Sequence, residues 1–142
     1  MNDERMVPVR LSRVILREDS QRQWIHLQEV DGERGFPIVI GIGEAIEIRR
    51  VLHGESPPRP LTHQLLHAVI DRLGAKVERV DIVDLRDNTF FAELVLTDAA
   101  GNELAIDARP SDALALGLRS GCELRVAESV LEQVRTDSGP DS

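Results

Sequence analysis

Hydrophobic residues in the early part of the chain recur at every second position, a spacing typical of half-buried β-strands. Such stretches lie at residues 7–16, 24–30 and 36–40. After residue 43 the spacing changes to that of a helix, whose apolar face carries Ala45, Ile48 and Leu52. The pattern therefore predicts three strands followed by a helix that ends at Gly54.

A proline-rich stretch at residues 55–60 separates this helix from a second one. Its prolines fix φ and remove backbone donors, so we expect a stiff, exposed connector. The next helical pattern places Leu65, Leu66, Val69 and Leu73 in one apolar stripe. We expect this stripe to be buried, as apolar faces of helices usually are.

The second half of the chain repeats this succession of patterns. Its expected elements are strands at 80–85, 90–96 and 104–106, a helix from about Ser111, a short strand at 123–126 and a last helix ending at Val134. These elements predict a single α+β domain over residues 1–135, with helices packed on a mainly antiparallel or mixed sheet. Residues 136–142 are expected to be a disordered polar tail.

The two halves align when the chain is shifted along itself. In one register Glu44 falls on Asp112 and Ala45 on Ala113, so each expected helix opens on an acidic residue followed by Ala. This repetition favours an internal duplication of a unit of three strands and one helix. Chance similarity of two amphipathic stretches is the alternative.

The composition fits one intracellular domain. A chain of 142 residues with 42% hydrophobic and 30% charged residues suits a single core. The single cysteine, Cys122, excludes an internal disulfide and suits a reducing compartment. The first residues are charged, and no apolar run approaches the roughly 20 residues of a membrane span. We therefore expect a soluble, cytoplasmic protein that makes no membrane contact.

The net charge of −8 argues against indiscriminate attraction to nucleic acid, because phosphate neutralisation supplies most of that affinity. Lys76 is the single lysine among the 17 cationic side chains, and the others are arginines. Their planar guanidinium groups suit bidentate contacts with phosphate or carboxylate. Any cationic site is therefore expected to consist of arginine.

Candidate chemistry gathers at residues 107–112, at an expected junction of strand and helix. Asp107, Arg109, Ser111 and Asp112 bring two carboxylates, a guanidinium and a hydroxyl together there. Local structure offers another interpretation, since Ser111 and Asp112 suit the start of a helix and Arg109 can pair with Asp107. Glu44 occupies the position of Asp112 in the first repeat.

A third candidate group follows the proline-rich connector, which presents Arg59 and leads to Thr62 and His63. Thr62 is expected to be the N-cap of the second helix. His63 and His67 are one helical turn apart, but the Glu of the His-Glu-x-x-His zinc motif is missing. The sequence therefore leaves a metal site on this pair as an open alternative.

Several motifs, in their order along the chain, resemble those of the bacterial bifunctional nuclease domain family. They are Pro37-Ile38-Val39-Ile40-Gly41 with Glu44-Ala45, Pro57-Pro58-Arg59-Pro60-Leu61-Thr62-His63, Leu73-Gly74-Ala75, Phe90-Phe91-Ala92-Glu93-Leu94 and Asp107-Ala108-Arg109-Pro110-Ser111-Asp112-Ala113. The resemblance runs from about Val9 to about Leu131. The second and last motifs together make it more specific than either alone.

The resemblance implies a small α+β fold and self-association, with a homodimer favoured. It also implies a nuclease that cleaves both DNA and RNA with little sequence selectivity, acting as DNase and RNase. One position departs from the family pattern, because Gln64 stands where an acidic residue often follows the histidine. A carboxylate at that position is therefore not available to orient His63 or to hold a metal.

If the chain is a nuclease, we expect Glu44, His63, Asp107 and Asp112 to be its catalytic residues. A divalent cation, Mg²⁺ or Mn²⁺, held by some of Glu44, Asp107 and Asp112 would bring the phosphate to the carboxylates and lower the pKa of a bound water. His63 would act as general acid or base.

Arg59 and Arg109 are expected to hold the phosphate oxygens, with Thr62 and Ser111 supporting the site. In the alternative hypothesis the chain is no enzyme. The same Asp and Arg residues would then form structural pairs in a ligand-binding or protein-interaction module. Convergence of the candidate residues in the folded chain distinguishes the two hypotheses.

Overall fold

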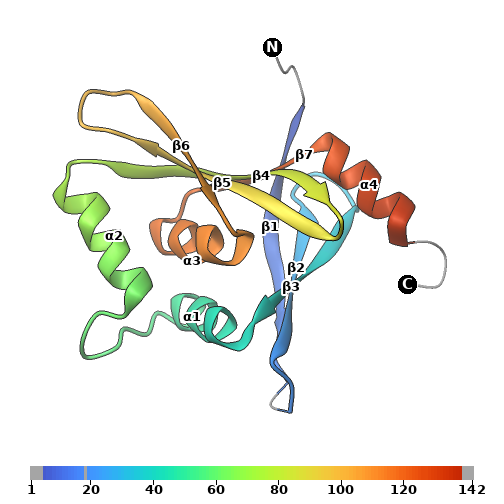
Figure 1. Cartoon of the computed structure of the whole chain (residues 1–142), viewed down its shortest axis with the longest axis horizontal. Coiled ribbons are helices and arrows are strands. Elements are labelled where there is room, and N and C mark those ends of the chain that lie inside the picture. Colours follow the sequence, from blue (N-terminus) through green and yellow to red (C-terminus); the bar gives the residue numbers. More distant parts are fainter. Residues whose placement is uncertain (1–4, 18, 139–142) are drawn as a thin grey trace.

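The computed structural model describes residues 5–17 and 19–138, which form seven strands and four helices (Figure 1). The strands are β1 (Met6–Ile15), β2 (Arg22–Glu29), β3 (Gly35–Gly41), β4 (Lys76–Arg86), β5 (Thr89–Thr97), β6 (Glu103–Ala108) and β7 (Glu123–Ala127). The helices are α1 (Ile42–Leu52), α2 (Thr62–Arg72), α3 (Pro110–Ser120) and α4 (Glu128–Ser138). Each of these elements was expected from the sequence, with shifts at the ends.

The strands form one sheet in the order β3-β2-β1-β7-β4-β5-β6. Neighbouring strands are antiparallel except β4 and β7, which run parallel. β7 is the last strand in the chain, yet it lies between β1 and β4 and so joins the two sets of three strands. The α+β class and the mixed, mainly antiparallel sheet are therefore confirmed.

Each set of three antiparallel strands is followed along the chain by a helix, α1 after β3 and α3 after β6. This succession agrees with the unit that the sequence repeats. It does not establish a duplicated origin, and the internal duplication stays a prediction.

Alternate residues of the strands face the core, as a period of two requires. In β3, Phe36, Ile38 and Ile40 are buried, whereas Pro37 and Val39 are exposed. In Figure 1 the two sets of strands run in different directions, and α1 and α3 lie side by side in the angle between them. The starts of α1 and α3 are thereby brought close together.

α3 is the most deeply buried helix of the described residues. Pro110 forms its first turn, where a missing N–H costs nothing, and Gly121 ends it with a φ of 68°. A Cβ on Gly117 would lie 2.6 Å from Val80 Cγ2 on β4. The absence of a side chain at this position lets α3 pack directly on the strand.

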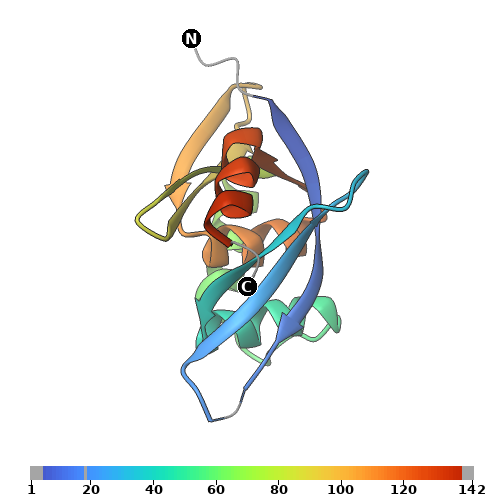
Figure 2. The same cartoon turned by 90° about the vertical axis from the view of Figure 1, so that its right-hand side faces the viewer.

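α4 lies on the side of the molecule opposite α2 (Figures 1 and 2). Its Val130 and Leu131 are buried. Arg34, just before β3, bonds Glu128 at 2.6 Å and Glu29 at 2.8 Å and so ties α4 to the edge of the sheet. Because α4 ends at Ser138, the first three residues of the expected polar tail are helical, and 139–142 lie outside the described residues.

The apolar stripe of α2 is exposed, although the sequence predicted that it would be buried. Leu65, Leu66, Val69 and Leu73 are 56%, 43%, 44% and 74% exposed, and Ile70 is the buried residue of the helix. α2 instead turns its polar side toward α1 and α3. The prediction of a buried stripe is therefore wrong.

Within the described residues, no helix has the length and apolar character needed to cross a membrane.

Candidate functional site

A hydrogen-bonded group of polar side chains lies where the starts of α1, α2 and α3 meet. His63, in the first turn of α2, has its Nε2 2.8 Å from Oδ1 of Asp112, in the first turn of α3. Arg109, the N-cap residue of α3, donates from Nε to Oδ2 of Asp112 at 2.9 Å. Both carboxylate oxygens of Asp112 therefore have partners.

Glu44 completes this group from the first turn of α1. Its Oε1 lies 3.5 Å from Nη1 of Arg109, whose Nη2 lies 2.8 Å from Asp112 Oδ2. One guanidinium thus lies between the two acids that the sequence aligns. We refer to Glu44, His63, Arg109 and Asp112 as the Arg109 cluster.

The electrostatics of the cluster favour a fully ionised Asp112. Burial is the largest influence on this carboxyl and raises its pKa, but hydrogen bonds from His63 and Arg109, with their charges, outweigh burial and lower the pKa. The Asp112 carboxylate in turn raises the pKa of Arg109. An ionised Asp112 only accepts hydrogen bonds, so Nε2 of His63 carries the proton in this contact.

A groove of about 500 Å³ opens beside the cluster. Its lining comes from the start of β2, from β3, from the start of α1, from the β4–β5 turn and from the junction of β6 and α3. It includes Glu44, Asn88, Arg109 and Ser111. The turn has positive φ at Asp87 (50°) and Asn88 (64°), as a two-residue hairpin turn requires. Glu44 and Arg109 therefore face a space that can hold a ligand, whereas His63 and Asp112 lie behind them.

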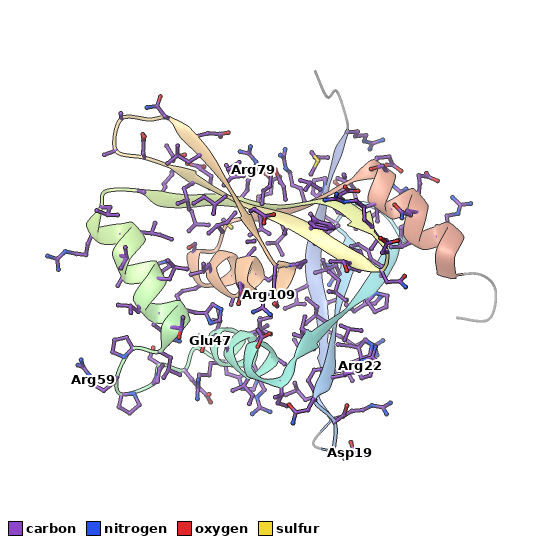
Figure 3. The ribbon with its side chains drawn as sticks, in the orientation of Figure 1. Asp19, Arg22, Glu47, Arg59, Arg79 and Arg109 are labelled. Atoms are coloured by element: carbon purple, nitrogen blue, oxygen red, sulfur yellow. The ribbon has the colours of Figure 1, made fainter. Side chains whose placement is uncertain are left out.

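Arg22 is a second arginine of this groove, and sequence reasoning did not identify it. It is the first residue of β2 and is paired in the sheet with Gly41, just before α1 (Figure 3). The local sequence around Arg22 gives no functional signal. Only the pairing of β2 with β3 places it near Glu44.

The position of His63 depends on a buried network that the sequence did not reveal. The Gln64 amide donates to Glu47 on α1 and accepts a 2.8 Å bond from the Leu61 N–H. Glu47 is 4% exposed and also bonds Arg119 of α3 at 3.1 Å. Gln64 thus fixes the start of α2. In the sequence, the position of Gln64 three residues after Leu61 is the capping pattern that could have indicated this role.

Two expected helix starts are corrected by these contacts. Leu61, not Thr62, is the N-cap residue of α2, and Thr62 is exposed as the first residue of the helix. Arg109 is the N-cap of α3, while Ser111 is buried within its first turn and lines the groove. The local alternatives in which Thr62 or Ser111 caps a helix are therefore wrong.

Two predicted site residues lie apart from the cluster. Asp107 is exposed and paired in the sheet with Glu93, and its strand neighbour Ile106 is paired with the buried Leu94. Because successive side chains of a strand point to opposite faces, Asp107 faces away from α3. Arg59 is exposed in the connector and points outward at the edge of the molecule (Figure 3).

The expected metal ligands are not brought together. Across residues 5–17 and 19–138, no group of three or more His, Cys, Asp and Glu side chains could hold a metal ion. Arg109 lies between Glu44 and Asp112, and Asp107 faces elsewhere. His67 contacts Ser120 at 3.1 Å rather than His63. As placed in the described residues, Glu44, Asp107 and Asp112 do not converge as one set of metal ligands.

The arrangement can recognise an anion and move a proton. Arg109 offers a guanidinium group to a phosphate in the groove, which Arg22 also lines, and Arg109 is 68% exposed despite its ion pairs. Glu44 offers a carboxylate beside them. An anion-binding groove with an adjacent base is the geometry that hydrolysis of a phosphate ester needs.

Comparisons with known proteins point in the same direction. The model of a family described as the bifunctional nuclease domain matches residues 25–138. Two relatives from Mycobacterium tuberculosis, each named only as an uncharacterized protein, are 38% identical over 128 residues, which cover 90% of this chain and 76% of the relative. Bifunctional nuclease 1 of Oryza sativa subsp. japonica is 25% identical over 114 residues, 78% of this chain but 34% of the rice protein.

Proposed function

Because the chain belongs to the bifunctional nuclease domain family, we propose that it hydrolyses phosphodiester bonds of nucleic acid in the groove beside the Arg109 cluster. The observation that carries this proposal is the single guanidinium of Arg109 between Glu44 and Asp112, at the edge of a groove that Arg22 also lines. The residues supply a phosphate contact and a base within one site.

In the proposed reaction Arg22 and Arg109 hold the oxygens of the scissile phosphate. Glu44 repels the phosphate, so the guanidinium groups must offset this repulsion before a substrate binds. The Arg109 side chain is exposed to solvent, so it can stay paired with Asp112 while its remaining N–H groups contact the phosphate. Asp112 and His63 position Arg109 and do not contact the substrate themselves.

Glu44 is the proposed general base. It accepts a proton from a water, the water oxygen attacks phosphorus, and the bond from phosphorus to the leaving oxygen breaks. The leaving oxygen takes a proton from solvent, so the step consumes one water and yields a phosphate monoester and a hydroxyl. Arg109 offsets the charge that develops on the phosphate oxygens.

Cleavage of both DNA and RNA is part of the proposal. The charged contacts offered by Arg22 and Arg109 suit phosphate oxygens, which carry no information on base sequence. The other lining groups include aliphatic residues of β3 such as Pro37 and Val39, together with polar side chains such as Gln21 and Asn88. We expect low selectivity because the phosphate contacts supply most of the affinity.

The test uses single-stranded DNA and RNA of one sequence, labelled at the 5′ end, with highly purified protein. We expect Glu44→Gln and Arg109→Ala each to lower kcat/KM by about 100-fold, because each removes a group that acts at the phosphate. Asp107→Asn is the matched control, since it removes a carboxylate outside the groove, and it should retain wild-type turnover. Equal residual activity in all four proteins would indicate a contaminating nuclease.

Divalent-metal assistance stays a prediction, and the same assay tests it. Turnover in EDTA is compared with turnover in Mg²⁺ or Mn²⁺. Activity that requires the ion and is lost in Asp107→Asn would mean that the carboxylates rearrange around a metal. Unchanged turnover in EDTA would contradict metal assistance.

One observation favours the alternative of a non-catalytic binding module. Both oxygens of Asp112 are engaged within the chain, as in a structural ion pair. If purified protein binds labelled oligonucleotide, loses that binding in Arg22→Ala and Arg109→Ala, and shows no turnover, the groove is a binding site and not a catalytic one.

A further inference from the structure

Phe90, at the start of β5, is the aromatic residue among those that line the groove in the described part of the chain. The sequence contains three phenylalanines, one tryptophan and no tyrosine. Phe36 is 2% exposed, and the rings of Trp24 and Phe91 lie under arginine guanidinium groups at 5.6 and 4.0 Å. Phe90 is therefore the ring that shares the groove with Arg109.

The ring of Phe90 is held in place by the two parts of the sheet. Its centroid lies 5.4 Å from that of the Phe36 ring, and the planes are stacked at 25°. Phe90 is also paired across the hairpin with Leu85, which is 5% exposed. Phe36 covers one face of a side chain that is only partly buried. A ring fixed in this way loses little conformational freedom when a ligand packs on it.

The position of Phe90 relative to Arg109 follows from the pairing of β5 with β6. Ala92 is paired with Ala108, the residue before Arg109. Phe90 precedes Ala92 by two residues, which span about 7 Å along a strand. The ring and the guanidinium thus lie along one groove, at a separation comparable to that between a phosphate and a base in the same nucleotide.

We propose that Phe90 is the base-binding residue of the groove, and that its ring stacks on an unpaired base next to the phosphate held at Arg109. Every base has a π-face, so stacking adds affinity without selecting a sequence. A base inside a duplex is already stacked and paired, whereas the bases of single strands, loops and ends are free to splay out. The substrate class is therefore single-stranded nucleic acid. This inference rests on the proposed function of the groove.

The charge of the protein gives such a contact weight. A net charge of −8 opposes the approach of nucleic acid, and Glu44 adds a carboxylate inside the groove itself. Phosphate contacts also weaken as salt is added. Stacking involves no charged group of the protein, so it supplies affinity that neither the acidic surface nor salt removes.

The test measures binding by fluorescence anisotropy with Glu44→Gln as the parent protein, so that the probe is not consumed. The probes are a labelled single strand of mixed sequence, an abasic strand of equal length, and the single strand annealed to its complement. We expect the parent to bind the single strand about 10-fold more tightly than the abasic strand or the duplex, because both lack an unpaired base.

Phe90→Leu in this parent should reduce the preference for the single strand over the abasic strand to about 2-fold or less. Phe91→Leu is the matched control, since it makes the same change on the next residue, whose side chain points to the opposite face of the sheet. It should keep the full preference. Equal binding of the two strands by the parent would overturn the proposal, and so would tight duplex binding.

A purely structural role of Phe90 would give a different result. Phe90→Leu would then weaken binding of the single strand and the abasic strand by the same factor, and the role in base binding would be lost. Crosslinking tests the contact without a change at Phe90. A strand that carries iodouracil is irradiated with the parent, and the adduct is mapped by mass spectrometry. We expect it at Phe90, and adducts confined to other residues would contradict the contact.

Turnover of the same single strand by the wild-type protein is measured separately. A base preference that depends on Phe90, without turnover, would overturn the nuclease proposal and leave the role of Phe90 intact. Turnover without a base preference would do the reverse. If the parent binds none of the probes, both proposals are lost.

Discussion

Asp112 and His63 lie 49 positions apart in the chain and are joined by a 2.8 Å contact between Asp112 Oδ1 and His63 Nε2. Gln64, the residue after His63, has no carboxylate to orient the histidine. Gln64 instead bonds Glu47 and fixes the start of α2, so that His63 faces α3. The orientation of the histidine therefore depends on tertiary packing rather than on its neighbour in sequence.

Removing the charge of Asp112 should lower nuclease activity, because Asp112 holds the Arg109 guanidinium in position. Asp112→Asn retains an acceptor oxygen but removes the charge that holds the guanidinium, so we expect kcat/KM on labelled oligonucleotides to fall about 10–100-fold. His63→Asn, which removes the second partner of Asp112, should have a smaller effect in the same direction. If Asp112→Asn matches wild type, Asp112 does not position Arg109 for the reaction.

Asp112 should also give folding stability a pH dependence in the acid range. Its pKa in the folded chain is lowered below the ordinary 3.8, since His63 and Arg109 outweigh the effect of burial. Such a group adds stability that is complete above about pH 5 and is lost as pH falls through 3.8 toward the folded-state pKa. Urea unfolding from about pH 6 to 3 should therefore show a smaller loss in Asp112→Asn than in wild type. Equal losses would contradict the assignment.

Strand and helix positions followed from the sequence because they depend on local periodicity. β3 is an example, since Phe36, Ile38 and Ile40 alternate with exposed residues in the structure as the pattern predicts. The acid at each helix start was visible as well, at Glu44 and Asp112. In the structure both acids converge on one arginine, Arg109.

Other parts of the site depend on which side of an element meets the rest of the chain. Helical spacing shows that Leu65 and Val69 share a face of α2, but it cannot show that the opposite, polar face has partners on α1 and α3. In the same way, only the sheet register places Asp107 on the face away from α3. Arg22 enters the groove through strand pairing that no local motif encodes.

Because α3 packs closely on β4, adding a single methyl group at Gly117 should strongly destabilise the fold. In Gly117→Ala the new Cβ would lie 2.6 Å from Val80 Cγ2 and 3.1 Å from Cys122 Sγ. We expect the free energy of unfolding to fall by about 1–3 kcal/mol. Gly43→Ala is the matched control in α1, because its Cβ meets nothing within 4 Å, and it should be neutral or stabilising by up to about 1 kcal/mol. Equal stability of the two variants in urea unfolding would contradict this packing.

The buried Glu47 should be more important for stability than the more exposed acids of the Arg109 cluster. It is 4% exposed and bonds Gln64 and Arg119, so it connects α1 with α2 and α3. Glu47→Ala would leave Arg119 poorly solvated without its carboxylate partner, and we expect a loss of about 2–3 kcal/mol in the free energy of unfolding.

Glu47→Gln separates charge from hydrogen bonding in the same position. Its amide oxygen can still accept from Arg119, so we expect it to lose less stability than Glu47→Ala. Because Gln64 fixes the start of α2, Glu47→Ala should also increase amide hydrogen exchange in residues 62–66 more than in β4. Unchanged exchange in α2 together with unchanged stability would mean that the contacts of Glu47 do not hold α2, and hence His63, against the body of the domain.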